Sequence, residues 1–167
     1  MFTASATTHA SKHELYAELS GQARGLFAGE RDRIANAANL SALIFHQLPD
    51  LNWCGFYFFD GHELVVGPFQ GQPACVRIAM GRGVCGSAAQ TRTTQRVADV
   101  HAFADHIACD AASASELVVP LVDRAGRLVG VLDLDSPLAD RFDAEDQTGI
   151  EALAALFLDA IEPPSET

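Results

Sequence analysis

Apolar side chains recur at helical spacing at the start of the chain. The first such segment follows Ser11, and Glu14 three residues later completes a capping-box pattern. Its apolar positions, which share one helical face, are Leu15, Leu19, Ala23 and Leu26. We therefore predict an amphipathic helix that begins near Ser11.

Two further segments show the same periodicity. A second helix is predicted from about Arg31 to Gln47, ending near Pro49, and a closing helix begins at Asp143 and Asp146. The expected inward residues are Ile34, Ala38, Leu43 and Ile44 in the second helix, and Ile150, Leu153, Phe157 and Ile161 in the closing one.

Between these helices, short runs of apolar and aromatic residues alternate with polar ones, a pattern typical of strands. Asp60-Gly61 and residues 123–126 are turn sequences that join neighbouring runs as hairpins. Gly81-Arg82-Gly83 precedes a short helix predicted at 84–91, and residues 101–114 are expected to be irregular. The predicted strands cover residues 53–59, 63–67, 74–80, 96–100, 116–122 and 128–135.

This order of elements predicts an α+β domain with a central, mostly antiparallel sheet. The N- and C-terminal helices are expected to pack together on one face of that sheet. A chain of 167 residues fits one domain, which we place at residues 11–162. Residues 1–10 are expected to form a flexible N-terminus and residues 163–167 a tail.

Charge and composition narrow the classes of partner. Eleven Lys and Arg against 22 Asp and Glu leave a formal net charge of −11, which repels phosphate backbones and anionic lipid headgroups. No apolar run approaches the roughly 20 residues of a membrane span, and the start of the chain lacks a secretory pattern. We therefore expect a cytoplasmic protein with no nucleic-acid or membrane partner.

The four cysteines occupy two kinds of position. Cys54 alternates with aromatic residues and is predicted to be a buried core residue. Cys75, Cys85 and Cys109 lie at the edges of predicted elements, beside Gly, Pro, His or Asp residues. In a reducing compartment, such cysteines are more often inert, metal-binding or catalytic than part of permanent disulfides.

Two kinds of chemistry suit the three edge cysteines. Zinc could be bound by His101, His106, Cys109 and Cys85, but their spacing fits no standard zinc module. Redox chemistry requires one activated thiol and a second thiol that resolves the sulfenic acid formed on the first. Cys109 together with Cys85 and Cys75 meets this requirement, and that chemistry needs no metal or other cofactor.

Several motifs carry a resemblance to a known family. They are NWCGFYFF, GPFQGQPACVRI, GRGVCG, VADVHAF, HIACDAASASELVVPL and GVLDLDS, and they cover most of residues 52–136. Together they resemble the free methionine-(R)-sulfoxide reductases, single-domain enzymes of the GAF fold. The resemblance implies an oxidoreductase that reduces free L-methionine (R)-sulfoxide to methionine in repair after oxidative stress. It also implies a thioredoxin-like reductant and a homodimer.

The resemblance implies a role for each matching position. Cys109 would be the nucleophile, Cys85 the main resolving thiol, and Cys75 able to substitute for Cys85. The substrate-binding residues that it implies are Trp53 and Tyr57 as an aromatic wall and Glu116, Asp133 and Asp135 as carboxylates. One departure is Ala104-Asp105, where the family usually has Pro-Gly, because it adds a charge near Cys109.

Plainer interpretations of the same residues stay open at this point. Glu116, Asp133 and Asp135 could be solvent-facing residues of alternating strands, and Trp53 and Tyr57, four positions apart, could share a face for core packing alone. The rival functional class is a GAF-type sensor that binds a small ligand or reports oxidation without turnover, because a fold does not determine function.

Overall fold

The computed structural model describes residues 11–103 and 111–162. Cys109 and His106, and the Ala104-Asp105 pair, lie outside these residues. In chain order the elements are α1 (Lys12–Phe27), α2 (Arg33–Gln47), β1 (Trp53–Phe59), β2 (Glu63–Gly71), β3 (Arg77–Ala79), α3 (Gly83–Thr91), β4 (Gln95–Val97), the 3₁₀ turn η1 (Val100–Ala102), β5 (Ser115–Val122), β6 (Leu128–Ser136) and α4 (Ala144–Ile161).

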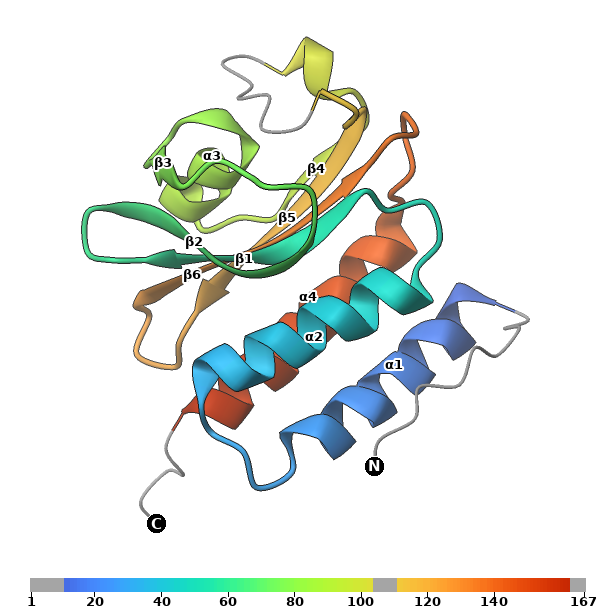
Figure 1. The fold of residues 1–167 in the computed structure, drawn as a ribbon, viewed down its shortest axis with the longest axis vertical. Helices are drawn as coiled ribbons and strands as arrows, with labels where there is room; N and C mark the ends of the chain where they lie inside the picture. The colour runs from blue at the N-terminus through green and yellow to red at the C-terminus, as the bar shows by residue number, and fades with distance from the viewer. Residues whose placement is uncertain (1–10, 104–110, 163–167) are drawn as a thin grey trace.

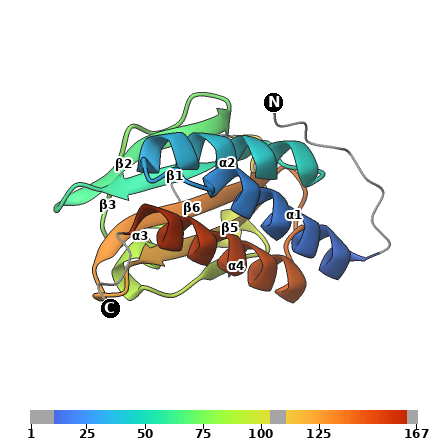
Figure 2. The same cartoon turned by 90° about the horizontal axis from the view of Figure 1, so that it is seen from below.

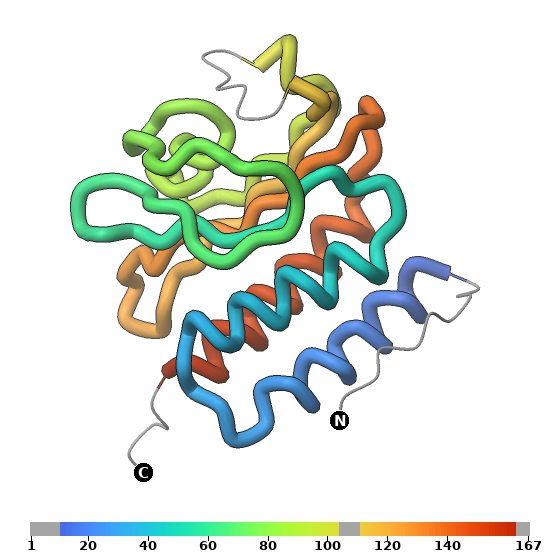
Figure 3. Tube along the Cα trace, viewed as in Figure 1, coloured from blue at the N-terminus to red at the C-terminus, as the bar shows by residue number. Residues whose placement is uncertain are grey.

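One six-stranded sheet organises the fold, with the strand order β3-β2-β1-β6-β5-β4. Every neighbouring pair is antiparallel. Helices α1, α2 and α4 form a layer on one face, and α3 lies against the other face (Figures 1 and 2). The predicted α+β architecture, with terminal helices on one face, is confirmed; the trace in Figure 3 shows α1 and α4 side by side.

The predicted capping residues begin the terminal helices. The Ser11 hydroxyl accepts a hydrogen bond from the Glu14 N–H at 3.2 Å, and Asp143 and Asp146 form a complete capping box at the start of α4. Asp146 is fully buried, yet it is ion-paired with Lys12 at 2.6 Å and accepts a hydrogen bond from the Tyr16 hydroxyl at 2.8 Å. These contacts join α1 to α4 and compensate for burial of the carboxylate.

Strand alternation divides the interior into two apolar clusters. Phe56 and Phe58 of β1 point into the helical layer, whereas Trp53 and Tyr57 point to the face that α3 covers. Cys54 is fully buried in the helical layer, as predicted, and carries a free thiol. The side of the sheet that α3 covers is therefore the side that carries the predicted site residues Trp53 and Tyr57.

The inward face of α2 differs from the prediction. Ile34 is 48% exposed and Ala38 is also exposed, whereas Asn36 and Ser41 are buried. The Ser41 hydroxyl donates to the Ala37 carbonyl at 2.8 Å, so its burial leaves no unpaired donor. Leu43 and Ile44 are buried as predicted, so the apolar pattern identified only part of the inward face, because polar residues also occupy inward positions.

Two strands are shorter than predicted. The run at 74–80 contributes only the three residues of β3, and the run at 96–100 contributes β4, after which η1 begins. None of the helices in the described part of the chain is long and apolar enough to cross a bilayer.

Candidate active site

The register of the sheet brings the three predicted carboxylates together. Asp135 of β6 lies opposite Trp53 of β1 on one side and opposite Glu116 of β5 on the other. Asp133 occupies the next position of β6 that points to the same face, because side chains alternate along a strand. The neighbouring strands β5 and β6 thus present their acidic residues to one patch of the sheet, and β1, which is distant in sequence, borders it with Trp53.

An aromatic wall borders this patch. The Trp53 ring stacks on Tyr57 with ring centroids 5.7 Å apart and on Phe69 at 5.2 Å. The Trp53 indole N–H donates to the carbonyl of Gln72 at 3.2 Å, which fixes the ring against the segment that leads to β3. Trp53 and Tyr57 are buried, and both also line a pocket.

That pocket lies between the sheet and α3. It holds about 510 Å³ of space counted out to its open mouth. Six of the eight predicted site residues line it: Trp53, Tyr57, Cys85, Glu116, Asp133 and Asp135. Glu116 and Asp133 are only 6% and 5% exposed, so the interpretation of these residues as solvent-facing is wrong.

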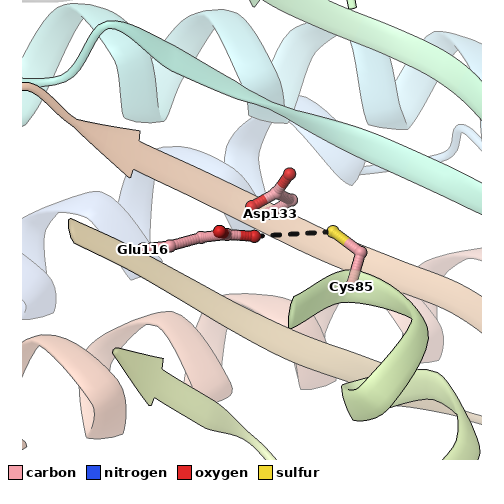
Figure 4. Close-up of side chains that lie close together, drawn as sticks. All are labelled: Cys85, Glu116 and Asp133. Atoms are coloured by element: carbon pink, nitrogen blue, oxygen red, sulfur yellow. Dashed lines mark hydrogen bonds between the residues drawn. The ribbon is translucent and has the colours of Figure 1, made fainter. Parts of the chain in front are cut away.

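Cys85, Glu116 and Asp133 form a compact cluster at the base of the pocket. The Cys85 thiol donates to Glu116 Oε1 at 3.8 Å, and one polar atom from each residue lies within 4.8 Å of the other two (Figure 4). Cys85 comes from α3, and the two acids come from β5 and β6. Asp133 Oδ1 is buried without a hydrogen-bond partner among the described residues.

Burial shifts the titration of this cluster. It raises the pKa of Glu116 well above its usual range, and the charges of Asp133 and Asp135 raise that pKa further. Burial also raises the pKa of Asp133, to about 7, against the effect of hydrogen bonds with Cys85 and Glu116. The pKa of the Cys85 thiol is raised well above its usual range by burial, then by Asp133 and Glu116.

These shifts decide what the cluster can do. At neutral pH it retains protons, so it can donate a hydrogen bond or a proton to a bound oxygen. The three atoms are close enough to contact one small cation, but metal ligands must give up their protons, which this environment opposes. The other predicted zinc residue in the described part of the chain, His101, is exposed on η1.

The cysteines differ in their state. Cys54 and Cys85 are free and buried, whereas Cys75 is disulfide-bonded. Cys75 follows Ala74, which lines the pocket, and packs against the apolar cluster that contains Trp53 and Tyr57. Cys109 lies outside the described residues.

Sequence patterns did not identify seven further residues of the pocket wall. They are Pro73, Ala74, Ile78, Arg82, Gly83, Val84 and Ser113. The Gly81-Arg82-Gly83 break before α3 was the available signal for Arg82, Gly83 and Val84. Ser113 is buried and accepts a hydrogen bond from the Asn52 side-chain amide at 3.0 Å, a contact between residues 61 positions apart that no local pattern encodes.

Comparison with known proteins agrees with this geometry. The GAF domain family matches residues 33–161. The chain is 51% identical, over 87% of each chain, to the free methionine-R-sulfoxide reductase of Escherichia coli (strain K12).

Solved structures show the same architecture. The free methionine-R-sulfoxide reductase of Neisseria meningitidis, determined in complex with its substrate, is 42% identical with a TM-score of 0.88, and the match covers 92% of each chain. A proposed GAF sensor protein of Burkholderia vietnamiensis is 68% identical with a TM-score of 0.88, over 90% of this chain and 96% of that one. The GAF fold expected from the sequence motifs is thereby confirmed. The chain belongs to the GAF-domain family and, within it, to the free methionine-R-sulfoxide reductases.

Proposed function

We propose that this protein reduces free L-methionine (R)-sulfoxide to L-methionine by cysteine chemistry. The observation that carries the proposal is the pocket beneath α3, where stacked aromatic rings adjoin carboxyl groups whose burial favours protonation. The substrates named for the E. coli and N. meningitidis relatives have the chemistry that such a pocket would recognise.

The two ends of the pocket suit the two ends of the substrate. The faces of Trp53 and Tyr57 offer a flat apolar surface for the methyl-sulfinyl group. Asp135, at the more exposed edge of the acidic patch, can accept charge-assisted hydrogen bonds from the substrate ammonium.

Protonated carboxyls then activate the sulfoxide. A sulfoxide sulfur is a poor electrophile until its oxygen accepts a hydrogen bond or a proton. Glu116, with its raised pKa and Asp133 beside it, is the group best suited to donate that proton at neutral pH. The cluster thus places a donor where negative charge develops on the oxygen during attack at sulfur.

The redox steps balance without a cofactor. The Cys109 thiol attacks the sulfoxide sulfur, and the sulfoxide oxygen is transferred to Cys109. Methionine then leaves, and Cys109 remains as a sulfenic acid. A second thiol of the chain condenses with the sulfenic acid, which releases water and forms a disulfide. A thioredoxin-like dithiol protein reduces this disulfide by thiol exchange and becomes oxidised in turn.

We assign the resolving step to Cys75 before Cys85, which reverses the order implied by the resemblance. Two observations support this choice: Cys75 is disulfide-bonded, and Cys85 is a free thiol whose pKa is raised by burial. A thiol that retains its proton is a poor nucleophile. Cys85 would then act mainly as part of the hydrogen-bonded cluster with Glu116.

Incubation with free methionine (R)-sulfoxide, thioredoxin, thioredoxin reductase and NADPH tests the proposal. We expect NADPH oxidation that saturates with sulfoxide and yields one methionine per NADPH. Saturable binding without any NADPH oxidation, together with no methionine release in dithiothreitol, would favour the sensor instead. The same preparations, measured by sedimentation, test the proposed homodimer, and cell fractionation tests the proposed cytoplasmic location.

A further inference from the structure

The cysteines of the described chain differ in how easily another protein can reach them. Cys85 is only 4% exposed and lines the pocket beneath α3. Cys75 is disulfide-bonded, half-buried, and lies in segment 72–76, which leads from β2 to β3. Thiol exchange requires an attacking sulfur to approach one sulfur of the disulfide directly. Cys75 therefore lies on the side of the molecule that a reducing protein has to approach.

Apolar side chains next to Cys75 are exposed. Val76 is 64% exposed, more than the other two large exposed apolar side chains of the described chain, Leu138 at 49% and Ile34 at 48%. Pro73, two residues before Cys75, is exposed as well. Exposed apolar side chains that group around one feature are typical of an interaction site. Such side chains flank Cys75 on both sides along the chain.

The strand that follows presents backbone groups to a partner. β3 is the last strand at one edge of the sheet and, in the described part of the chain, pairs with β2 alone (Figure 1). The Val66 N–H donates to the Val76 carbonyl at 3.0 Å. Because backbone groups alternate in direction along an antiparallel strand, the N–H and carbonyl of Arg77 point away from β2. No described residue forms a hydrogen bond with them. A strand edge of this kind can accept an extended segment of another protein.

Hydrogen bonds hold segment 72–76 at both ends. Its first carbonyl accepts the Trp53 indole N–H at 3.2 Å, and its last accepts the Val66 N–H at 3.0 Å. Pro73 restricts the backbone between them, because its ring fixes one dihedral angle. A partner that binds an ordered segment loses less conformational entropy than one that must order the segment first. Cys75 is thus presented in a defined position.

Electrostatic attraction contributes little at this edge. The Arg77 guanidinium is ion-paired with Asp60 at 3.0 Å and with Glu63 at 2.8 Å, and the chain has a formal net charge of −11. Apolar packing and backbone pairing are therefore what a partner can use, next to the disulfide that it reduces. We infer that Pro73, Val76 and the outer edge of β3 form the docking surface for the thioredoxin-like dithiol protein, an assignment that rests on the proposed function.

The reaction at this surface consists of two exchanges. The partner's thiolate attacks Cys75 Sγ, a mixed disulfide forms, and the cysteine previously bonded to Cys75 leaves as a thiolate. The second thiol of the partner then loses its proton and attacks the partner's own sulfur in the mixed disulfide, which releases Cys75 as a thiolate. Both released thiolates take up protons. The disulfide of this chain gains two electrons, and the dithiol of the partner is oxidised to a disulfide.

A single reduction of the oxidised protein tests the surface without turnover of a sulfoxide. The disulfide of Cys75 is formed with diamide, and its reduction by thioredoxin or by dithiothreitol is followed by alkylation and mass spectrometry. Val76→Asn is the test variant. Ile34→Asn, at another exposed apolar position on α2, is the control for the loss of such a side chain. Circular dichroism verifies that both variants fold.

We expect Val76→Asn to slow reduction by thioredoxin about fivefold or more, because apolar contact area is lost. Reduction by dithiothreitol should change less than twofold, since a small dithiol needs no docking surface. Ile34→Asn should change neither rate. Equal slowing with the two reductants, or no slowing with thioredoxin, would overturn the surface.

A second pair of variants isolates the backbone contribution. Arg77→Ala removes the side chain alone, whereas Arg77→Pro also removes the outward N–H, a change that an edge strand tolerates. Arg77→Pro should be reduced by thioredoxin about fivefold more slowly than Arg77→Ala, since one hydrogen bond to the partner is lost. The two variants should react alike with dithiothreitol, and equal rates with thioredoxin would exclude strand pairing at this edge.

Two other outcomes separate this inference from the claims around it. If Val76→Asn dissociates the proposed homodimer in sedimentation and leaves the thioredoxin rate unchanged, the edge binds a second copy of the chain and the docking assignment is wrong. If the expected rates are found in a protein that releases no methionine from its sulfoxide, the docking surface is supported and the proposed reductase function is contradicted.

Discussion

Replacement of Asp133 with Asn tests the electrostatics of the pocket through folding stability. Burial raises the pKa of Asp133 from its ordinary value of 3.8 to about 7. A carboxyl whose pKa is higher in the folded state opposes folding once it ionises. The cost is negligible below pH 3.8, grows as pH rises, and is complete above pH 7.

The size of the effect follows from the shift. One pKa unit corresponds to about 1.4 kcal/mol, so a shift of roughly three units costs about 4 kcal/mol of unfolding free energy when complete. By the same relation, the cost of ionising Asp133 increases by about 2.5 kcal/mol between pH 5 and pH 8. Asn cannot ionise, so Asp133→Asn should gain about this much stability relative to wild type over that range.

Urea unfolding of the reduced proteins, followed by Trp53 fluorescence at several pH values, measures the difference directly. Asp60→Asn is the matched control, because backbone hydrogen bonds from Glu63 and His62 lower the pKa of Asp60 to about 2. Asp60 is ionised in both states above pH 5, so its replacement should shift stability by a constant amount. Parallel curves for wild type and Asp133→Asn from pH 5 to pH 8 would refute the assigned shift.

Four further outcomes are expected. Cys109→Ser should abolish methionine release, measured by chromatography, and persistent turnover would exclude Cys109 as the nucleophile. Cys75→Ser should release about one methionine per site and then lose thioredoxin-coupled turnover, whereas Cys85→Ser should retain more of that turnover. A disulfide map of the wild type after one turnover tests the order of the resolving cysteines, and a map that lacks a Cys75–Cys109 link would contradict Cys75 as the first. Gly149→Ala should lower the free energy of unfolding, measured by thermal denaturation, by about 1 to 3 kcal/mol, because the added Cβ meets the Tyr16 ring where α1 packs on α4. Gly21→Ala, in α1 with nothing within 4 Å of the new Cβ, should raise it by about 0.5 to 1 kcal/mol, and a loss at that position would refute the helix-propensity argument.

The electrostatic prediction also bears on catalysis. Loss of a proton donor or of its partner typically costs 10²- to 10⁴-fold in rate, so Asp133→Asn should be more stable at pH 8 yet slower in methionine release. Functional sites commonly keep residues that lower folding stability because activity requires them. Glu116→Gln should show the same opposition between stability and activity, since burial raises the pKa of Glu116 too.

Sequence patterns determined much of the local structure. The capping residues Ser11 and Asp143 begin their helices as predicted, and strand alternation placed Trp53 and Tyr57 on one face. Cys54 was assigned correctly to the core. These features depend on neighbours within a few positions, where backbone geometry alone sets which side chains share a face.

Tertiary structure decided the rest. Periodicity identified Leu43 and Ile44 on the inward face of α2 but not the whole face. The polar residues Asn36 and Ser41 also point inward, where the Asn36 amide and the Ser41 hydroxyl donate to backbone carbonyls. Periodicity could not bring Asp135 opposite Trp53, because the pairing of β6 with β1 joins strands that are distant in sequence.

The pocket itself depends on that same long-range packing. Packing of distant segments, α3 among them, against the acidic patch buries Glu116 and Asp133, and this burial raises the pKa of both carboxyls. The chain alone specified which residue types were present and, along each strand, which side chains shared a face. Their charge states and their shared pocket came from burial, which packing between distant segments creates.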